Sequence, residues 1–466
     1  MVVVGDAAVT GWPASFAWGA ASSAFQIEGD AAGRGRSVWD AFCRRPGAVF
    51  GGHTGNRACD HVRRWREDLA LMRRMGLHAY RFSVSWPRVM PQGVGRENTR
   101  GLDFYDRLVD ELLGAHIEPW LTLFHWDYPL ALYRRGGWRN RDSADWFAEY
   151  TARVADRLAD RVDRWITLNE PQCFIDYGHR TGIHAPGDRL PMPAVLRAAH
   201  HALLAHGRAV QVLRASARRP LSIGIAHAAV VHVPHDERRE QDRRAAMNAM
   251  AAVAPGSTWN NVWWSDPIFL GRPPATGRRA YGAAAADALA EDGAVIAQPL
   301  DFVGLNVYSG VPVRGDARGR PREMPLPPGT PMSLCRWAVL PRSLYWAATF
   351  FHARYKTPVV ITENGISLPD WVGADGRVRD AARIDYLERY LGALHAAIRA
   401  GVDVRGYFHW TLLDNFEWAE GYKERFGLVH VDFATGQRTP KDSARWYRNW
   451  IRSCRGRPPV APPRGV

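Results

Sequence analysis

Short, almost wholly apolar runs recur along the chain, separated by longer stretches in which apolar residues return every three or four positions. Residues 118–124 (EPWLTLF) and 359–363 (VVITE) are two such runs. Short runs without a polar face are typical of parallel strands that are buried on both sides. We predict eight strands, over residues 16–21, 78–83, 118–124, 164–169, 221–229, 302–306, 359–363 and 404–410.

The segments between these runs carry helical periodicity. Within residues 101–114, one stripe is formed at spacings of three and four by Leu102, Tyr105, Leu108, Val109 and Leu112, as in an amphipathic helix. Similar patterns predict helices over 60–75, 142–160, 195–217, 236–252, 279–290, 380–399 and 440–452. Strands that alternate with helices predict an α/β fold, the (β/α)₈ TIM barrel, whose active sites lie on the loops after the strands.

The length of 466 residues suits a single barrel domain with long βα loops. We expect an N-terminal arm over residues 1–11, the barrel over 12–452 and a disordered Pro/Arg-rich tail over 453–466. Residues 310–332 are rich in Gly, Pro and Arg and are predicted to form a long loop over the barrel mouth. No internal repeat or linker divides the barrel.

Charge and composition narrow the choice of partners. A net charge of +14 first suggests nucleic acid or a membrane, but the arginines are scattered in pairs rather than gathered in one tract. The five cysteines show no C-x-x-C spacing, and the N-terminus lacks the basic start of a secretory signal. No apolar stretch approaches the ~20 residues that span a bilayer. We therefore predict a cytoplasmic protein that binds neither nucleic acid nor membrane; the sequence makes no prediction of oligomeric state.

Two glutamates, Glu170 and Glu363, stand where predicted buried strands end. The carboxyl ends of barrel strands meet at one face, so both carboxylates are expected to face one cleft. Two carboxylates flanking a bond are the groups that cleave glycosides. Hydrogen-bonding and aromatic side chains at the other strand ends converge on the same face: Gln26, Glu28, Arg81, His125, Trp126, Asn169, Asn306, Tyr308, Trp410, Glu417 and Trp418.

Six motifs follow one another along these strands. They are residues 16–29 (FAWGAASSAFQIEG), 80–86 (YRFSVSW), 125–127 (HWD), 167–171 (TLNEP), 361–365 (ITENG) and 413–418 (LDNFEW). In these motifs the chain resembles glycoside hydrolase family 1, the retaining β-glycosidases, over roughly residues 12–452.

The resemblance implies a retaining double displacement with Glu363 as nucleophile and Glu170 as acid/base. To stay ionised, a nucleophilic carboxylate needs a cation and a hydrogen-bond donor, for which Arg81 and Tyr308 are the candidates. Asn306 is placed with them among the catalytic residues. The charge of Glu363 is expected to raise the pKa of Glu170, so that this acid starts protonated. Retention predicts carboxyl groups about 5–5.5 Å apart.

The resemblance also implies a set of sugar-binding residues. Asn169 is expected to bind the 2-hydroxyl, Glu417 the 4- and 6-hydroxyls, and Trp337 to wall the leaving group. The full set is Gln26, His125, Trp126, Asn169, Trp337, Trp410, Glu417, Trp418 and Phe426. Because a carboxylate at Glu417 repels phosphate, we predict unphosphorylated β-glucosides or cello-oligosaccharides as substrates, with β-galactosides and β-fucosides as further ones.

Four alternatives stay open: a transglycosylating enzyme, a 6-phospho-β-glucosidase, a silent sugar-binding barrel and a metal-dependent barrel enzyme. A metal-dependent enzyme needs a cluster of metal ligands. His53, His61, His200 and His201 are the histidine candidates, and their sequence context does not favour metal binding. We therefore predict no metal and no cofactor. Three departures from the family pattern are Cys173 after Asn-Glu-Pro-Gln, His179 in place of Tyr, and residues 271–274 without a Tyr. We place all three outside the sugar-ring shell.

Overall fold

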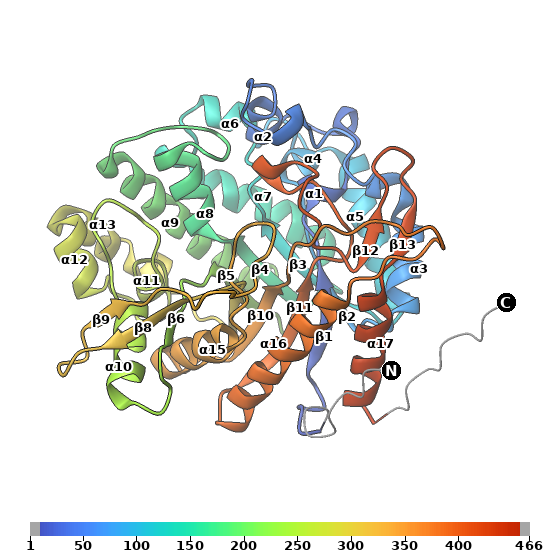
Figure 1. The fold of residues 1–466 in the computed structure, drawn as a ribbon. Helices are drawn as coiled ribbons and strands as arrows, with labels where there is room; N and C mark the ends of the chain where they lie inside the picture. The colour runs from blue at the N-terminus through green and yellow to red at the C-terminus, as the bar shows by residue number, and fades with distance from the viewer. Residues whose placement is uncertain (1–9, 457–466) are drawn as a thin grey trace.

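Eight parallel strands close into a barrel in a computed structural model that describes residues 10–456 (Figure 1). Around the barrel the strands follow the order β1-β11-β10-β7-β5-β4-β3-β2. The barrel strands are β1 Ala17–Ala21, β2 Ala79–Ser83, β3 Glu118–Phe124, β4 Arg164–Asn169, β5 Ser222–Ala228, β7 Phe302–Asn306, β10 Val359–Asn364 and β11 Val404–Trp410. Each lies within one residue of its predicted bounds at either end, so the expected (β/α)₈ architecture is confirmed.

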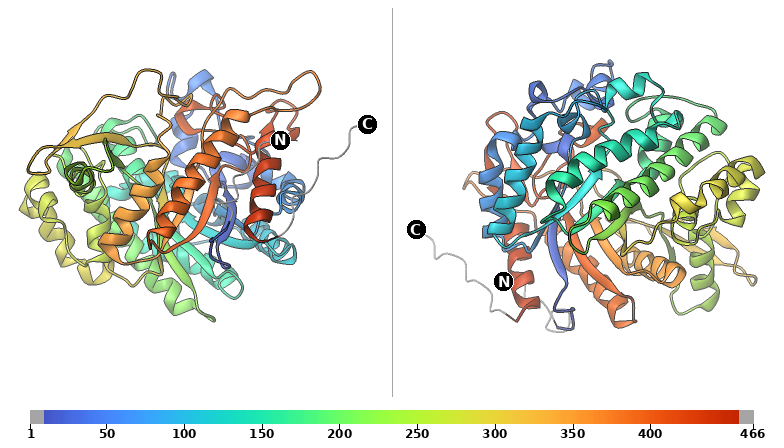
Figure 2. Two further views of the ribbon diagram at one scale, coloured as in Figure 1. Left: turned by 60° about the horizontal axis from the view of Figure 1, so that its bottom comes forward. Right: turned by 180° about the vertical axis from the view of Figure 1, so that it is seen from behind.

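Long helices surround the barrel on its outer side (Figure 2). They are α3 His61–Arg74, α5 Thr99–Gly114, α7 Ser143–Leu158, α9 Met192–Ser216, α10 Glu240–Met250, α15 Arg342–Tyr355, α16 Ala381–Arg399 and α17 Asp442–Cys454. Because α17 reaches Cys454, the last helix extends two residues past the expected boundary at 452. The rest of the expected tail from residue 457, and most of the expected N-terminal arm, lie outside the described residues.

Shorter elements occupy the βα loops and the gaps between long helices. They are α1 Ala24–Ile27, α2 Val38–Phe42, α4 Trp86–Val89, α6 Leu130–Arg134, α8 Pro171–Ile175, α11 Val262–Phe269, α12 Ala275–Tyr281, α13 Ala283–Glu291, α14 Gly293–Ile296, β12 Val429–Val431 and β13 Arg438–Pro440. The single helix expected over 279–290 is thus two, α12 and α13. Gly282 separates them with φ +90°, a conformation that glycine adopts readily and that a helix does not continue.

One expectation between β7 and β10 was wrong, and one helix in that segment was missed. Residues 310–332 are not one long loop, because β8 Val311–Gly315 pairs antiparallel with β9 Pro321–Glu323 and parallel with β6 His232–Pro234. This side sheet packs against α10 (Figure 1). Helix α15 was not predicted at all, because apolar residues occupy most of its circumference and leave no stripe to recognise.

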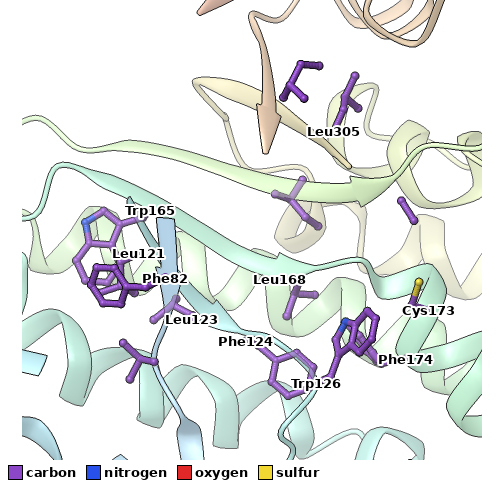
Figure 3. Close-up of a cluster of buried hydrophobic side chains, with 14 of the residues drawn as sticks. Phe82, Leu121, Leu123, Phe124, Trp126, Trp165, Leu168, Cys173, Phe174 and Leu305 are labelled. Carbon is purple, nitrogen blue, oxygen red and sulfur yellow. The ribbon is translucent and has the colours of Figure 1, made fainter. Parts of the chain in front are cut away.

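The strands bury both of their faces, and alternate residues point to opposite sides. Trp120 and Ile166 belong to a cluster inside the barrel, whereas Leu121 and Trp165 pack outward under the helices. Figure 3 shows part of this outer layer, with Phe82, Leu121 and Trp165 gathered at one end and Phe124, Trp126 and Phe174 at the other. The two-sided burial explains why the strands appear in the sequence as continuous apolar runs.

Candidate active site

Four barrel strands bring the first group of polar residues together. Arg81 comes from β2, Asn169 ends β4, Asn306 ends β7 and Glu363 precedes the last residue of β10. The register shifts between Ile361 and Glu363 where β10 pairs with β7. A β-bulge of this kind re-aims the side chains that follow it.

Glu170 follows β4 in the left-handed conformation, with φ +48° and ψ +66°. In a regular strand, Asn169 and Glu170 would point to opposite faces. Here Asn306 Nδ2 donates to both of them, at 3.0 Å to Asn169 Oδ1 and 2.9 Å to Glu170 Oε1. The turn at Glu170 therefore brings two successive side chains into one site.

Glu363 has the cation and the donor that an ionised carboxylate requires. Arg81 Nη1 donates to its Oε1 at 2.7 Å, and the Tyr308 hydroxyl donates to its Oε2 at 2.6 Å. Arg81 Nη2 also donates to Asn169 Oδ1 at 2.6 Å. Only 1% of the Arg81 side chain and 4% of the Glu363 side chain are exposed, so this ion pair is shielded from water.

Among the described residues, the side chains that donate hydrogen bonds to the Glu170 carboxyl group are neutral. Asn306 donates to Oε1, and the thiol of Cys173 donates to Oε2 at 3.1 Å. Asn169 links the two glutamates, because its Oδ1 accepts from Arg81 at Glu363 and from Asn306 at Glu170. The two carboxyl groups thus share one buried network.

The two acids have different partners, which affect their pKa values differently. Burial, followed by the negative charge of Glu363, raises the pKa of Glu170 to about 7. Burial also raises the pKa of Glu363, but the Arg81 guanidinium and the Tyr308 hydroxyl oppose that rise. Glu170 is therefore the carboxyl that holds a proton near neutral pH while Glu363 stays charged.

A second polar group faces the same mouth from helix α1, which follows β1, and from the loop after β11. Gln26 Nε2 donates to Glu417 Oε2 and to Asn415 Oδ1, both at 3.1 Å, and Ser23 Oγ donates to Gln26 Oε1 at 2.6 Å. Burial, with the charges of Glu363 and Glu424 added, raises the pKa of Glu417 to about 8. This acid therefore carries a proton at neutral pH and is able to donate as well as accept. The repulsion of phosphate that was expected from a charged Glu417 is not supported, because burial keeps this carboxyl group mostly neutral.

His125 and Trp410 close the site between these two groups. His125 Nε2 lies 3.1 Å from Asn169 Nδ2, and its ring stacks at 5.8 Å on the ring of Trp410. Burial and the charge of Arg81 hold the pKa of His125 well below its usual value. A neutral imidazole has one donor and one acceptor nitrogen, which suits it to sugar hydroxyls.

Aromatic rings support the site from behind and form one wall of its entrance. Trp126 donates its indole N–H to Asn169 O at 2.9 Å and packs against Trp418, with ring centroids 4.6 Å apart. At the entrance, Trp337 lies 5.0 Å from the ring of Tyr308 and 6.1 Å from that of Phe426. The Trp337 side chain is 39% exposed, as expected for a residue at the open end.

Some residues singled out in the sequence lie elsewhere. Glu28 accepts from Arg88 at 2.7 Å and from the Tyr105 hydroxyl at 2.5 Å, in a structural ion pair. Within residues 10–456 no three His, Cys, Asp or Glu side chains gather as metal ligands, and none of the helices described there is long and apolar enough to cross a membrane. The four candidate histidines have other contacts: His53 with Tyr422, His61 with Asp68, His200 with Asp292 and His201 with Trp138.

Sequence reasoning misplaced one residue of the site. Cys173 was expected outside the sugar-ring shell, yet its thiol contacts Glu170. The signal was its spacing, because residues i and i+3 share a face once helix α8 begins directly after Glu170. His179 instead pairs with Asp188 at 2.9 Å. Two further residues were not predicted from the sequence. Thr362 donates to Asn306 Oδ1 at 2.6 Å, and the charge of Glu424 contributes to the raised pKa of Glu417.

The protein is an eight-stranded parallel barrel, and two buried glutamates with different hydrogen-bond partners lie where its strands end. This combination defines a barrel enzyme of the class that cleaves glycosides. The sequence model of glycosyl hydrolase family 1 matches residues 9–455. The chain belongs to glycosyl hydrolase family 1.

Beta-glucosidases from other organisms are similar to this protein over nearly its whole length. Beta-glucosidase A of Thermotoga maritima is 43% identical over 446 residues, which cover 95% of this chain and 98% of that protein. The beta-glucosidase of an Agrobacterium species is 44% identical, with 94% of each chain covered. The solved structure of the Thermotoga maritima beta-glucosidase in complex with glucoimidazole superposes with a TM-score of 0.86, at 43% identity, and covers 95% of this chain and 99% of that one.

Proposed function

We propose that the protein hydrolyses terminal, non-reducing β-D-glucosyl residues of unphosphorylated β-glucosides, with retention of configuration. The observation that carries this proposal is the unequal pair of buried acids, Glu363 held charged by Arg81 and Tyr308, and Glu170 with a pKa of about 7. The names of both relatives, beta-glucosidases, support glucosides as the substrates. We also propose that the protein is located in the cytoplasm.

The reaction proceeds in two displacements. A carboxylate oxygen of Glu363 attacks the anomeric carbon while Glu170 gives its proton to the departing oxygen, which leaves a glucosyl ester on Glu363. Once Glu363 is esterified, its charge no longer raises the pKa of Glu170. Glu170 then takes a proton from water, whose oxygen attacks the anomeric carbon and releases glucose and the Glu363 carboxylate. Asn169 accepts from Arg81, which binds Glu363, and from Asn306, which binds Glu170. This chain of hydrogen bonds between the two acids supports the close approach that retention requires.

Residues of both polar groups, with His125 and Trp410 between them, hold the sugar. Gln26, Glu417 and His125 supply donors and acceptors for the ring hydroxyls, and Asn169 is placed for the 2-hydroxyl. Trp410 offers a flat face to the ring, whereas Trp418 and Trp126 support the polar side chains. Trp337 and Phe426 receive the leaving group, such as a second glucose of a cello-oligosaccharide. β-Galactosides and β-fucosides are further substrates in this proposal.

The test uses the purified protein with 4-nitrophenyl β-D-glucoside and two variants. Glu363→Gly is expected to lose activity and to form an α-glucosyl azide when azide is added, because azide replaces the nucleophile. Glu170→Ala with azide is expected to give a β-glucosyl azide, because azide replaces the incoming water. Glu240→Ala, an exposed glutamate on α10, is the matched control and keeps full activity. Full activity in either site variant contradicts the proposal.

Two related activities are distinguished by their products. Transglycosylation uses the same ester, and an added alcohol then competes with water for it. A 6-phospho-β-glucosidase is recognised by a higher kcat/KM on the 6-phosphoglucoside than on the glucoside, the opposite of what we expect.

A further inference from the structure

The hydrogen-bond ladder between β4 and β5 changes where Glu170 makes its turn. Glu170 N donates to Ala226 O at 2.8 Å, as in a parallel pair of strands. The next bond of such a ladder would run from the Ala228 N–H to the Glu170 carbonyl. That carbonyl instead accepts from Cys173 N at 2.9 Å, in the first turn of helix α8. The left-handed turn therefore takes from Ala228 its usual acceptor in the ladder.

The side chain of Gln172 supplies the missing acceptor. Its Oε1 accepts from the Ala228 N–H at 3.3 Å, so a side-chain amide stands in for the backbone carbonyl of Glu170. Gln172 and Ala228 are both buried, and a buried N–H without an acceptor is unfavourable. Without Gln172, a regular strand would satisfy the Ala228 N–H and the left-handed turn would not. Gln172 thus favours the backbone conformation that brings Glu170 beside Asn169.

His227 fixes the orientation of the Gln172 amide. The Ala228 N–H is able only to donate, so the oxygen of Gln172 faces it, and Gln172 Nε2 faces His227 Nδ1 at 3.3 Å. His227 Nδ1 is then the acceptor, and the neutral ring carries its proton on Nε2. Burial lowers the pKa of His227 to about 3, which keeps the ring neutral. The ring also stacks on that of Phe351 in α15, with centroids 6.3 Å apart.

The end of β5 also contacts Asn306, which donates to Glu170 Oε1. Ala229, one residue after Ala228, donates its N–H to Asn306 O at 3.0 Å. Two successive amides of the chain, those of Ala228 and Ala229, therefore bind the turn after Glu170 and the residue that holds its carboxyl group. A shift of α8 against β5 would move Glu170 relative to Asn306.

We propose that Gln172 and His227 are positioning residues for the acid/base Glu170. They stabilise the left-handed turn and the first turn of α8, so that the Glu170 carboxyl group lies where the leaving oxygen and the incoming water meet it. Within residues 10–456, neither side chain forms a hydrogen bond to Glu170 or Glu363, so both act through the backbone. The inference rests on the proposed glucosidase function.

The test compares kcat/KM on two substrates in the unaltered protein and in Gln172→Met. The leaving group of 2,4-dinitrophenyl β-D-glucoside departs without a proton, whereas that of phenyl β-D-glucoside needs one from Glu170. Methionine is as long as glutamine but has no amide to bind Ala228 and His227. We expect kcat/KM on the phenyl glucoside to fall about tenfold to a hundredfold, and kcat/KM on the dinitrophenyl glucoside to stay nearly unchanged.

Two variants of His227 make the same test from β5 and leave α8 unaltered. His227→Phe removes the acceptor of Gln172 Nε2, and we expect a smaller loss of the same selective kind. His227→Asn offers an amide oxygen to Gln172 and is expected to restore part of that loss. The matched control is Thr167→Val on β4. The Thr167 hydroxyl lies 2.7 Å from His206 Nδ1 in another buried pair, and we expect its removal to leave the ratio between the two substrates unchanged.

Azide gives a second readout, which a loss of stability alone would not change. With the dinitrophenyl glucoside, a displaced base slows hydrolysis of the Glu363 ester, so kcat and KM fall together. Azide needs no base, and we expect it to raise kcat in Gln172→Met and to yield a β-glucosyl azide. An unchanged ratio between the two substrates, or no response to azide, overturns the positioning role alone. Absence of glucoside cleavage in the unaltered protein overturns the proposed function itself.

Discussion

Removal of the Cys173 thiol is expected to extend the activity of the enzyme to higher pH. The thiol donates to Glu170 Oε2 at 3.1 Å, and Asn306 donates to the other oxygen. Both bonds favour the charged carboxylate and so lower the pKa of Glu170 against the larger effect of burial. Because Glu170 must be protonated for the first displacement, a higher pKa keeps the enzyme active further into the alkaline range.

The size of the shift follows from the strength of the bond. A thiol is a weak donor, so its bond to a carboxylate contributes about 0.5–1 kcal/mol, below the usual range for charged partners. At 1.36 kcal/mol per pKa unit, its loss raises the pKa of Glu170 by about 0.4–0.7. The alkaline limb, expected near a pH of about 7 in the unaltered protein, moves upward by that amount in Cys173→Ala.

The assay is the pH dependence of kcat/KM with 4-nitrophenyl β-D-glucoside, which reports the essential groups of the free enzyme. In Cys173→Ser a hydroxyl donor replaces the thiol, and the limb returns toward its original position. Cys43→Ala removes another buried thiol and serves as the control for general effects of cavity formation. An alkaline limb that stays in place or moves downward in Cys173→Ala refutes the reasoning.

Three further predictions concern the catalytic pair and the buried ions behind the site. Tyr308→Phe removes a 2.6 Å hydrogen bond to Glu363; we expect kcat/KM to fall about tenfold or more and the acidic limb of its pH profile to move upward, and an unchanged acidic limb contradicts this. Glu170→Gln is expected to remove the alkaline limb while a substrate with a good leaving group is still attacked; a limb that persists assigns it to another residue. Lys441 is buried and donates to Asp414 Oδ1 at 2.7 Å, so Lys441→Met is expected to lower the free energy of unfolding in urea by about 3 kcal/mol, and a loss below about 1 kcal/mol argues against it.

The success of the strand predictions and the failure at α15 have a common physical origin. Barrel strands are buried on both faces, so each appears as an apolar run between polar loops, and eight such runs were found. Helix α15 is also buried over most of its surface. A helix that is buried on all sides has no polar face, so its sequence lacks the periodic pattern of apolar and polar residues from which a helix is predicted.

The sequence by itself determined which side chains stand at the ends of the barrel strands, and so which acids, amides and aromatic rings are able to meet at one face. Only the tertiary structure decided how they meet. The bulge in β10 and the left-handed Glu170 turn Glu363, Asn169 and Glu170 into one network. The roles of the two acids depend on distance and burial, because a pKa responds to charges and donors in space rather than to neighbours along the chain. For the same reason the contacts of Cys173 and the burial of Glu424 became apparent only when the chain was folded.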